Sequence, residues 1–196
     1  MDRRIIKTKR SLQDALLGLL REQPFEQIEI QAITDRANTA RVTFYRHYGT
    51  KEELLLDVLE QIYRQMQKEF CYDSIEQILE FNQTPPIQRL FIFLEQDRLL
   101  YKKLLMGTAS ALIQRRVRQY IVQQIVSKFT AAPRYAEMPI VLIANQIAST
   151  VLGNIMWWLG DDLEYSGEYM ARITHQMSWS GAMTLAGRSE DITPVR

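Results

Sequence analysis

Apolar residues recur at helical spacing along most of this chain, and no stretch alternates apolar and polar residues as a half-buried strand does. The first run places Leu12, Leu16 and Leu20 on one helix face, and Pro24 ends that helix because proline cannot continue it. Glycine (8) and proline (6) are scarce among 196 residues, which favours long helices over turn-rich sheet. The pattern predicts an all-α fold of about nine helices.

Two short helical segments follow this first helix, and one turn residue separates them. The first segment, residues 30–37, presents Ile30 and Ile33 on one side, and residues 40–47 form the second. Between them lies Asn38, which after glycine best tolerates the left-handed backbone of a tight turn. This order of elements is the sequence form of a helix-turn-helix unit.

A capping box at Thr50–Glu53 opens a longer helix. The Thr50 hydroxyl can accept a hydrogen bond from the Glu53 amide, and the Glu53 side chain can bond back to Thr50. We place the domain boundary here, with a helix-turn-helix domain over residues 1–49 and a regulatory and dimerisation domain over residues 50–196. Further helices are predicted over residues 75–81, 101–106 and 109–129, and from Pro86, Pro139 and Ser166 onward.

Charge is distributed unevenly along the chain, whose net charge is +1. Residues 1–51 carry ten Lys and Arg against six Asp and Glu, while the remainder carries fourteen against seventeen. A basic first segment is suited to a polyanion, although ordinary surface charge would give the same count. Five cations stand near the N-terminus, where they oppose the helix dipole, and they either face phosphates or form a solvated arm: Arg3, Arg4, Lys7, Lys9 and Arg10.

An uncharged run from Met138 to Gly160 is long enough to cross a bilayer. Its amide and hydroxyl side chains argue against a membrane span, since buried polar groups in lipid need partners. A helix that is apolar all round belongs to a core or an interface. The single cysteine, Cys71, is either a packing residue or a redox sensor, and without a disulfide or a signal peptide the chain is expected in the cytoplasm.

One motif is specific. The run Thr43-Phe44-Tyr45-Arg46-His47-Tyr48 is followed, after one small residue, by Thr50-Lys51-Glu52 and a leucine-rich helix. This part of the chain resembles the DNA-binding domain of the tetracycline-repressor (TetR) family, closely over about residues 8–58. The remainder resembles the family in helix number, length and layout. The resemblance implies a homodimeric repressor that binds a palindromic operator and is released by a small molecule.

The resemblance also implies residue roles. Arg41, Val42 and Tyr45 would face bases, since arginine can donate twice to guanine and apolar groups can contact the thymine methyl. Lys51, in the first turn of a capped helix, would attract a phosphate. For His47 packing and phosphate contact stay open, and the remaining predicted DNA contacts are Gln31, Thr39 and Thr43.

Three positions depart from the family pattern. Asn38 replaces the usual glycine, Ala40 replaces a capping serine unless Thr39 caps a shifted helix, and Glu29 replaces a threonine. Loss of a cap costs about 1 kcal/mol. Glu29 could cap its own helix, but as an acid it would not contact phosphate, so operator affinity is expected to be modest or the docking altered.

For the regulatory half, the resemblance implies dimerisation through the last two helices, about residues 139–159 and 166–185. The absence of charge and the pair Trp157 and Trp158 agree with a large interface, to which we also assign Leu152. A purely internal core is the alternative. Aromatic, soft or polar side chains that could line an effector pocket for an apolar or planar molecule are Phe81, Phe91, Tyr101, Met106, Tyr120 and Asn145.

The sequence shows no motif that is typical of an enzyme active site. The two histidines, His47 and His175, are far apart, and no metal-ligand spacing, glycine-rich phosphate loop or nucleophile–base pair is visible. We therefore expect no catalytic residue, metal or cofactor. A rival interpretation is a helical homodimer of the same fold that uses its N-terminal domain for protein contacts, which Glu29 and Ala40 leave open.

Overall fold

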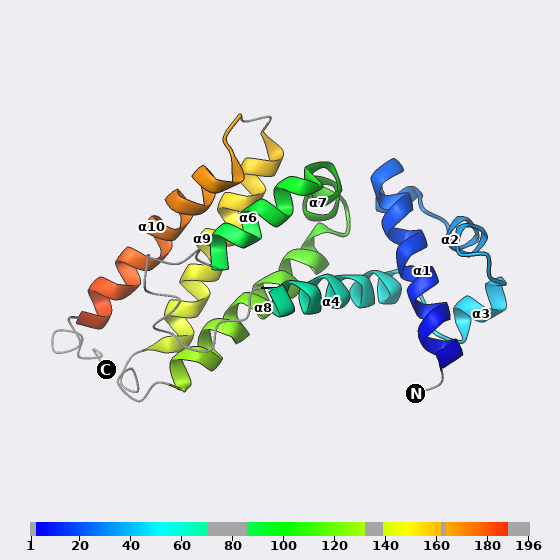
Figure 1. The fold of residues 1–196 in the computed structure, drawn as a ribbon, viewed down its shortest axis with the longest axis horizontal. Coiled ribbons are helices and arrows are strands. Elements are labelled where there is room, and N and C mark those ends of the chain that lie inside the picture. The colour runs from blue at the N-terminus through cyan, green and yellow to red at the C-terminus, as the bar shows by residue number, and fades with distance from the viewer. Residues whose placement is uncertain (1–2, 70–85, 132–138, 162–163, 188–196) are drawn as a thin grey trace. The chain divides into compact units, whose positions relative to one another are not determined.

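The computed structural model describes residues 3–69, 86–131, 139–161 and 164–187, and its regular elements there are all helical (Figure 1). The chain divides into two compact units. The first unit comprises Met1–Glu69 and Leu99–Ile113, and the second comprises Phe70–Arg98 and Gln114–Arg196. The predicted helix over 75–81, and with it Phe81, lies outside the described residues.

The first unit contains the helix-turn-helix. Helix α1 buries the apolar face that its spacing predicted and ends at Glu22, before Pro24. It packs against α2 and α4, and α2 packs against α3. The elements in chain order are α1 (Arg3–Glu22), the 3₁₀ helix η1 (Phe25–Gln27), α2 (Ile30–Arg36), α3 (Arg41–Tyr45) and α4 (Lys51–Glu69).

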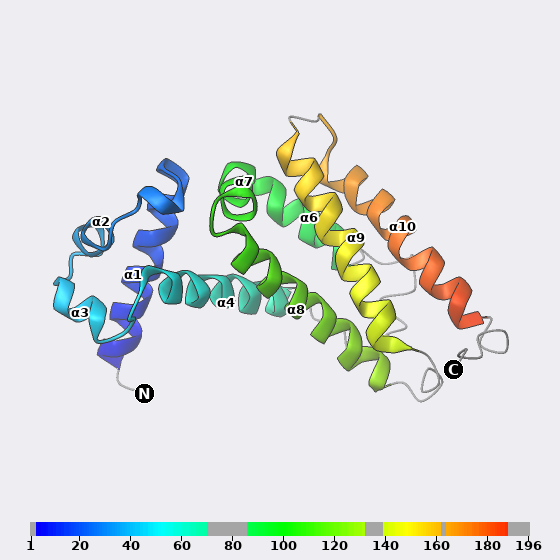
Figure 2. The same cartoon turned by 180° about the vertical axis from the view of Figure 1, so that it is seen from behind.

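The second unit is built around α10, which packs against α6 and α9 (Figure 2). Its core holds Trp158, which is fully buried and lies with its ring centroid 5.3 Å from that of Phe91. The predicted Ser166 cap is present, because the Tyr169 amide donates to the Ser166 hydroxyl at 3.2 Å. The helices beyond α4 are α6 (Pro86–Gln96), α7 (Arg98–Met106), α8 (Ser110–Thr130), α9 (Ile140–Gly160) and α10 (Gly167–Gly187).

Helix α9 is long and apolar enough to span a membrane, and 39% of its most apolar window is buried within the protein. A single helix of this kind is weak evidence for a span, because the core helix of a soluble protein has the same composition. One side of α9 carries the buried residues Ile143, Ile147, Leu152 and Trp158. The helix therefore contributes to the core of its own chain.

The burial on α9 corrects two of our interface assignments. Leu152 is 3% exposed and Trp158 is fully buried, so both pack inside the protomer and neither side chain is available to a second copy. Trp157, the adjacent residue, is 49% exposed. Successive helical residues point about 100° apart, which is why two neighbouring tryptophans have opposite environments.

Candidate nucleic-acid interface

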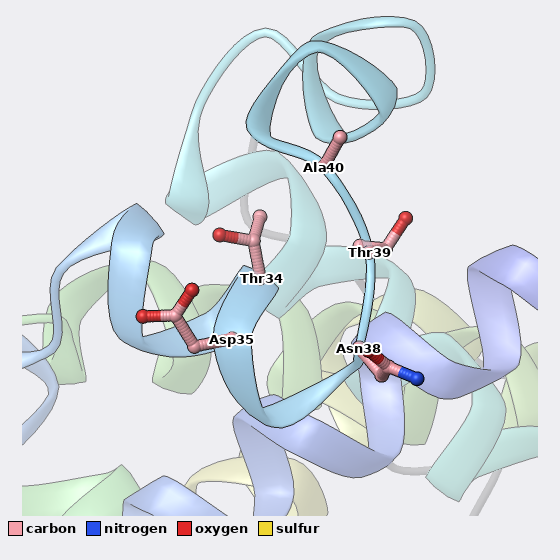
Figure 3. A pocket seen from close by; sticks show the side chains of 5 residues that line it. All are labelled: Thr34, Asp35, Asn38, Thr39 and Ala40. Atoms are coloured by element: carbon pink, nitrogen blue, oxygen red, sulfur yellow. The ribbon is translucent and has the colours of Figure 1, made fainter.

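The turn between α2 and α3 is built on Asn38. Its φ of 50° is the left-handed conformation that the sequence predicted. The amide of Thr39 donates to the Thr34 carbonyl at 3.0 Å, which returns the chain towards α3. Together with Asp35 and Ala40, these three residues line a hollow of about 340 Å³; Thr34 and Asp35 lie on α2, and Thr39 and Ala40 on the extended stretch beyond it (Figure 3).

Helix α3 has one face in the core and one in solvent. Phe44 is fully buried, whereas Val42 is 62% exposed and Tyr45 is 48% exposed. Arg41 is exposed as well, and its guanidinium Nη2 donates to the Tyr45 hydroxyl at 3.3 Å. The three side chains assigned to bases therefore share the solvent-facing side of a short helix that Phe44 anchors.

The helices α2 and α3 both begin without a side-chain cap. Glu29 occupies the N-cap position of α2, but its side chain makes no capping hydrogen bond. Ala40 is the N-cap of α3, so the helix start is not shifted to use Thr39. The Thr43 amide donates to the Ala40 carbonyl at 2.8 Å, which leaves the amides of Arg41 and Val42 available to an external acceptor such as a phosphate oxygen.

The link between α3 and α4 differs in one detail from the predicted capping box. The Glu53 amide donates to the Thr50 hydroxyl at 3.2 Å, as expected. The Glu53 carboxylate, however, accepts from the Gly49 amide at 2.7 Å. The reciprocal bond thus reaches one residue further back and ties the loop before Thr50 to the first turn of α4.

The Lys51 side chain binds backbone carbonyl groups within the first unit. Its Nζ atom lies 3.0, 3.1 and 2.9 Å from the backbone carbonyl oxygens of Phe25, Glu26 and Ile28. An ammonium group has three N–H donors, and each can serve one of these carbonyls. A phosphate contact by Lys51, which the sequence led us to expect, would require one of these bonds to break.

A polar cluster joins α1 to α4 and includes Tyr48, which follows α3 in the chain. One carboxylate oxygen of Asp57 accepts from the Tyr48 hydroxyl at 2.5 Å and from the Gln13 amide at 3.1 Å, and Lys9 Nζ lies 3.5 Å away. Burial raises the pKa of the Tyr48 hydroxyl well above its ordinary value, and the hydrogen bond to Asp57 and the carboxylate charge raise it further. Tyr48 therefore remains a donor, and it is a packing residue that is 4% exposed.

The other predicted contacts differ in their exposure to solvent. Gln31 is exposed, with its amide nitrogen bonded to Asp35 Oδ1 at 2.7 Å. Thr39, Thr43 and His47 are half-buried. Arg46, an exposed cation at the C-cap of α3, was not among the predicted contacts, although its place in the Tyr45-Arg46-His47 run was a signal for it. The N-terminal cations are not an arm, because α1 is already helical at Arg3.

The turn between α7 and α8 also contacts the helix-turn-helix. The carboxylate of Glu26, in η1, accepts from the Thr108 amide at 2.5 Å and from the Thr108 hydroxyl. Lys103 Nζ donates to the carbonyl of Arg21, in the last turn of α1, at 2.6 Å. A Cβ atom at Gly107 would lie 2.7 Å from the Lys103 carbonyl oxygen, so the turn requires glycine there.

The described candidate pocket residues differ in their exposure. Phe91 is core, Met106 is 45% exposed, and Tyr101 and Tyr120 are half-buried. Asn145 is exposed, and its amide donates to the Val141 carbonyl at 2.8 Å within α9. Tyr101 and Met106 belong to the first unit, and the other three to the second.

Two family models match this chain. Residues 12–58 match the model of bacterial regulatory proteins of the tetR family, and residues 82–179, half of the chain, match a transcriptional regulator C-terminal region. The first match includes α2, α3 and the turn between them. Among curated proteins, an uncharacterized HTH-type transcriptional regulator, YxbF from Bacillus subtilis (strain 168), is 44% identical over 62 residues, which are 31% of this chain and only 16% of that relative.

Solved structures share the fold at low identity. A TetR transcriptional regulator from Streptococcus agalactiae 2603V superposes with a TM-score of 0.64 at 22% identity, covering 90% of this chain and 96% of that one. A tetR-family regulator from Streptomyces coelicolor gives 0.67 at 18% identity, covering 97% and 86%. NalD from Pseudomonas aeruginosa, the secondary repressor of the MexAB-OprM multidrug efflux pump, gives 0.61 at 17%, covering 89% and 96%.

Proposed function

Since this chain belongs to the tetR family and is a DNA-binding transcriptional regulator, we propose that it is a cytoplasmic repressor. As a homodimer it binds a palindromic operator, and a small molecule releases it. The observation that carries this proposal is the two-sided α3 helix, with Phe44 in the core and Arg41, Val42 and Tyr45 in solvent. A short helix exposed in this way after a tight turn has the geometry that enters a major groove.

Contacts with the operator divide into reading and anchoring. Arg41, Val42 and Tyr45 reach base edges, and Gln31 does so once its amide leaves Asp35. Phosphates bind the uncapped start of α3 and the side chains around it. These side chains are Thr39, Thr43, Arg46 and His47, while Lys51 supports the site from within by holding η1 against α4.

Dimerisation uses the outer face of α9, which we define as Leu142, Gln146, Gly153 and Trp157. All four are exposed, and they fall on one side of the helix. Nothing lies within 4 Å of a Cβ atom built at Gly153, so a second helix can approach closely there. A two-fold axis at this face would bring identical residues together, as a palindromic operator requires.

Release by an effector requires the regulatory helices to move the helix-turn-helix. Two connections are suited to this: α4 itself, which Lys51 ties to η1, and the α7–α8 turn, which Thr108 ties to Glu26. Helix α8 begins in the first compact unit and continues into the second. The two recognition helices of a dimer must lie roughly 34–36 Å apart to fit successive major grooves, so a small tilt of either connection lowers affinity.

The test of this proposal is reciprocity between effector and operator. An apolar or planar molecule found by thermal-shift screening is titrated against the full chain with and without a duplex selected for tight binding. Adding operator should raise the dissociation constant of the effector by a certain factor. Adding effector should raise the dissociation constant of the operator by the same factor. Identical effector affinity in both titrations would show that it does not release this protein from DNA.

A further inference from the structure

Arg41 and Tyr45 contact each other across one turn of α3. Arg41 Nη2 lies 3.3 Å from the Tyr45 hydroxyl, and the guanidinium carbon lies 5.7 Å from the centroid of the Tyr45 ring. Residues four apart on a helix are neighbours on the same face, so the spacing alone favours this pair. Both side chains are exposed, and the pair therefore stands on the surface that the proposed function assigns to DNA.

The tyrosine ring is itself supported from the core. The Phe44 and Tyr45 rings meet edge to face, with centroids 5.5 Å apart and planes at 86°. Phe44 is fully buried and also contacts Tyr48 at 5.8 Å between centroids. Edge-to-face contacts of this kind fix ring orientation. A chain of contacts thus leads from the buried Phe44 through Tyr45 to the Arg41 guanidinium.

From this geometry we infer that Tyr45 is a positioning residue for sequence reading: it holds the Arg41 guanidinium ready to bind a guanine. The inference rests on the proposed function and gives Tyr45 a role beyond its own contact with DNA. A guanidinium has five N–H donors, so the bond to Tyr45 leaves enough for a bidentate contact with guanine O6 and N7. A long, flexible arginine side chain that is already held loses less conformational freedom on binding.

The alternative role for the Tyr45 hydroxyl is an anchoring contact with a phosphate, and the two roles predict different effects on the dissociation constants. Loss of an anchoring contact weakens binding to all duplexes alike, because phosphates carry no sequence information. Loss of a positioning residue weakens binding only to the sequence that Arg41 reads. Removal of the hydroxyl alone distinguishes them, because phenylalanine keeps the ring and its contact with Phe44.

The experiment compares full-length wild type, Tyr45→Phe, Arg41→Ala and the double variant by fluorescence anisotropy. Each is titrated with the preferred duplex, with the same duplex carrying substitutions at its G·C pairs, and with a random duplex. Tyr45→Phe should weaken the preferred duplex on the order of fivefold, as expected for one hydrogen bond, and leave the random duplex unchanged. In the Arg41→Ala background the same substitution should have no further effect on preference.

The matched control is Tyr165→Phe. Tyr165 lies outside the helix-turn-helix and is 44% exposed, close to the 48% of Tyr45. This substitution should leave every dissociation constant unchanged. Equal losses for Tyr45→Phe on all duplexes, or losses that simply add to those of Arg41→Ala, would overturn the positioning role. A wild type that shows no preference among duplexes would instead refute operator reading, so the two failures are distinguishable.

Discussion

Raising salt from about 50 to about 200 mM should weaken duplex binding by this protein on the order of 10³-fold. The reason is counterion release, because each phosphate that the protein neutralises returns a condensed cation to solution. The helix-turn-helix carries these exposed cations: Arg3, Arg4, Lys7 and Arg10 on α1, Arg41 on α3, and Arg46 at the C-cap of α3. Anisotropy titrations of a labelled duplex at several salt concentrations measure the slope.

Two variants that each remove one positive charge show which part of the protein causes the salt dependence of duplex binding. Arg46→Gln should reduce the salt slope by about one for each protomer, as the loss of one phosphate contact does. Lys128→Gln, at the end of α8 in the second unit, should leave the slope unchanged. An affinity that stays constant across the salt range would mean that this surface does not bind DNA.

A glutamate at the outer face of α9 should convert the dimer into a monomer. Leu142 is 69% exposed on one protomer, so Leu142→Glu is tolerated in the isolated chain and harmful only where a second copy covers it. Burial of an unpaired charge costs about 3–5 kcal/mol, and two-fold symmetry places the charge at the interface twice. Sedimentation velocity at micromolar concentration should show monomers with an unchanged circular dichroism spectrum.

Two control variants separate assembly from folding. Leu142→Ala removes apolar area without adding charge and should weaken the dimer much less. Leu152→Glu places the charge at a side chain that is 3% exposed within the protomer, so it should unfold the chain. Our dimer proposal fails if wild type sediments as a monomer, or if Leu142→Glu remains dimeric.

Some helix boundaries could be read from the sequence because local chemistry decides them, whereas α7, which was expected to begin at Tyr101, begins at Arg98. Pro24 and Pro86 set a helix end and a helix start where predicted, and Ser166 caps α10. Asn38 adopts the left-handed turn, because few other residues accept a positive φ. The buried position of Phe44 followed from the need of a recognition helix for one inward face.

The sequence was less informative wherever a side chain has two possible partners. Lys51 could bind a phosphate or a carbonyl, and only the fold brings the carbonyls of η1 within its reach. Trp157 and Trp158 differ by one helical step, and an uncharged helix offers no polar face to orient them. The contact of Thr108 with Glu26 spans 82 residues, a separation that periodicity cannot detect. The boundary after residue 49 stays a prediction.

Whether α3 reads DNA sequence is tested most directly by the effect of Arg41→Ala on specificity. Duplexes bound by the wild type are first selected from random DNA, and Kd is then measured for both proteins on the selected site and on a random duplex. We expect a loss of about 5- to 150-fold on the selected site, equivalent to roughly 1–3 kcal/mol, and little change on random DNA. Equal losses on both duplexes would contradict this expectation.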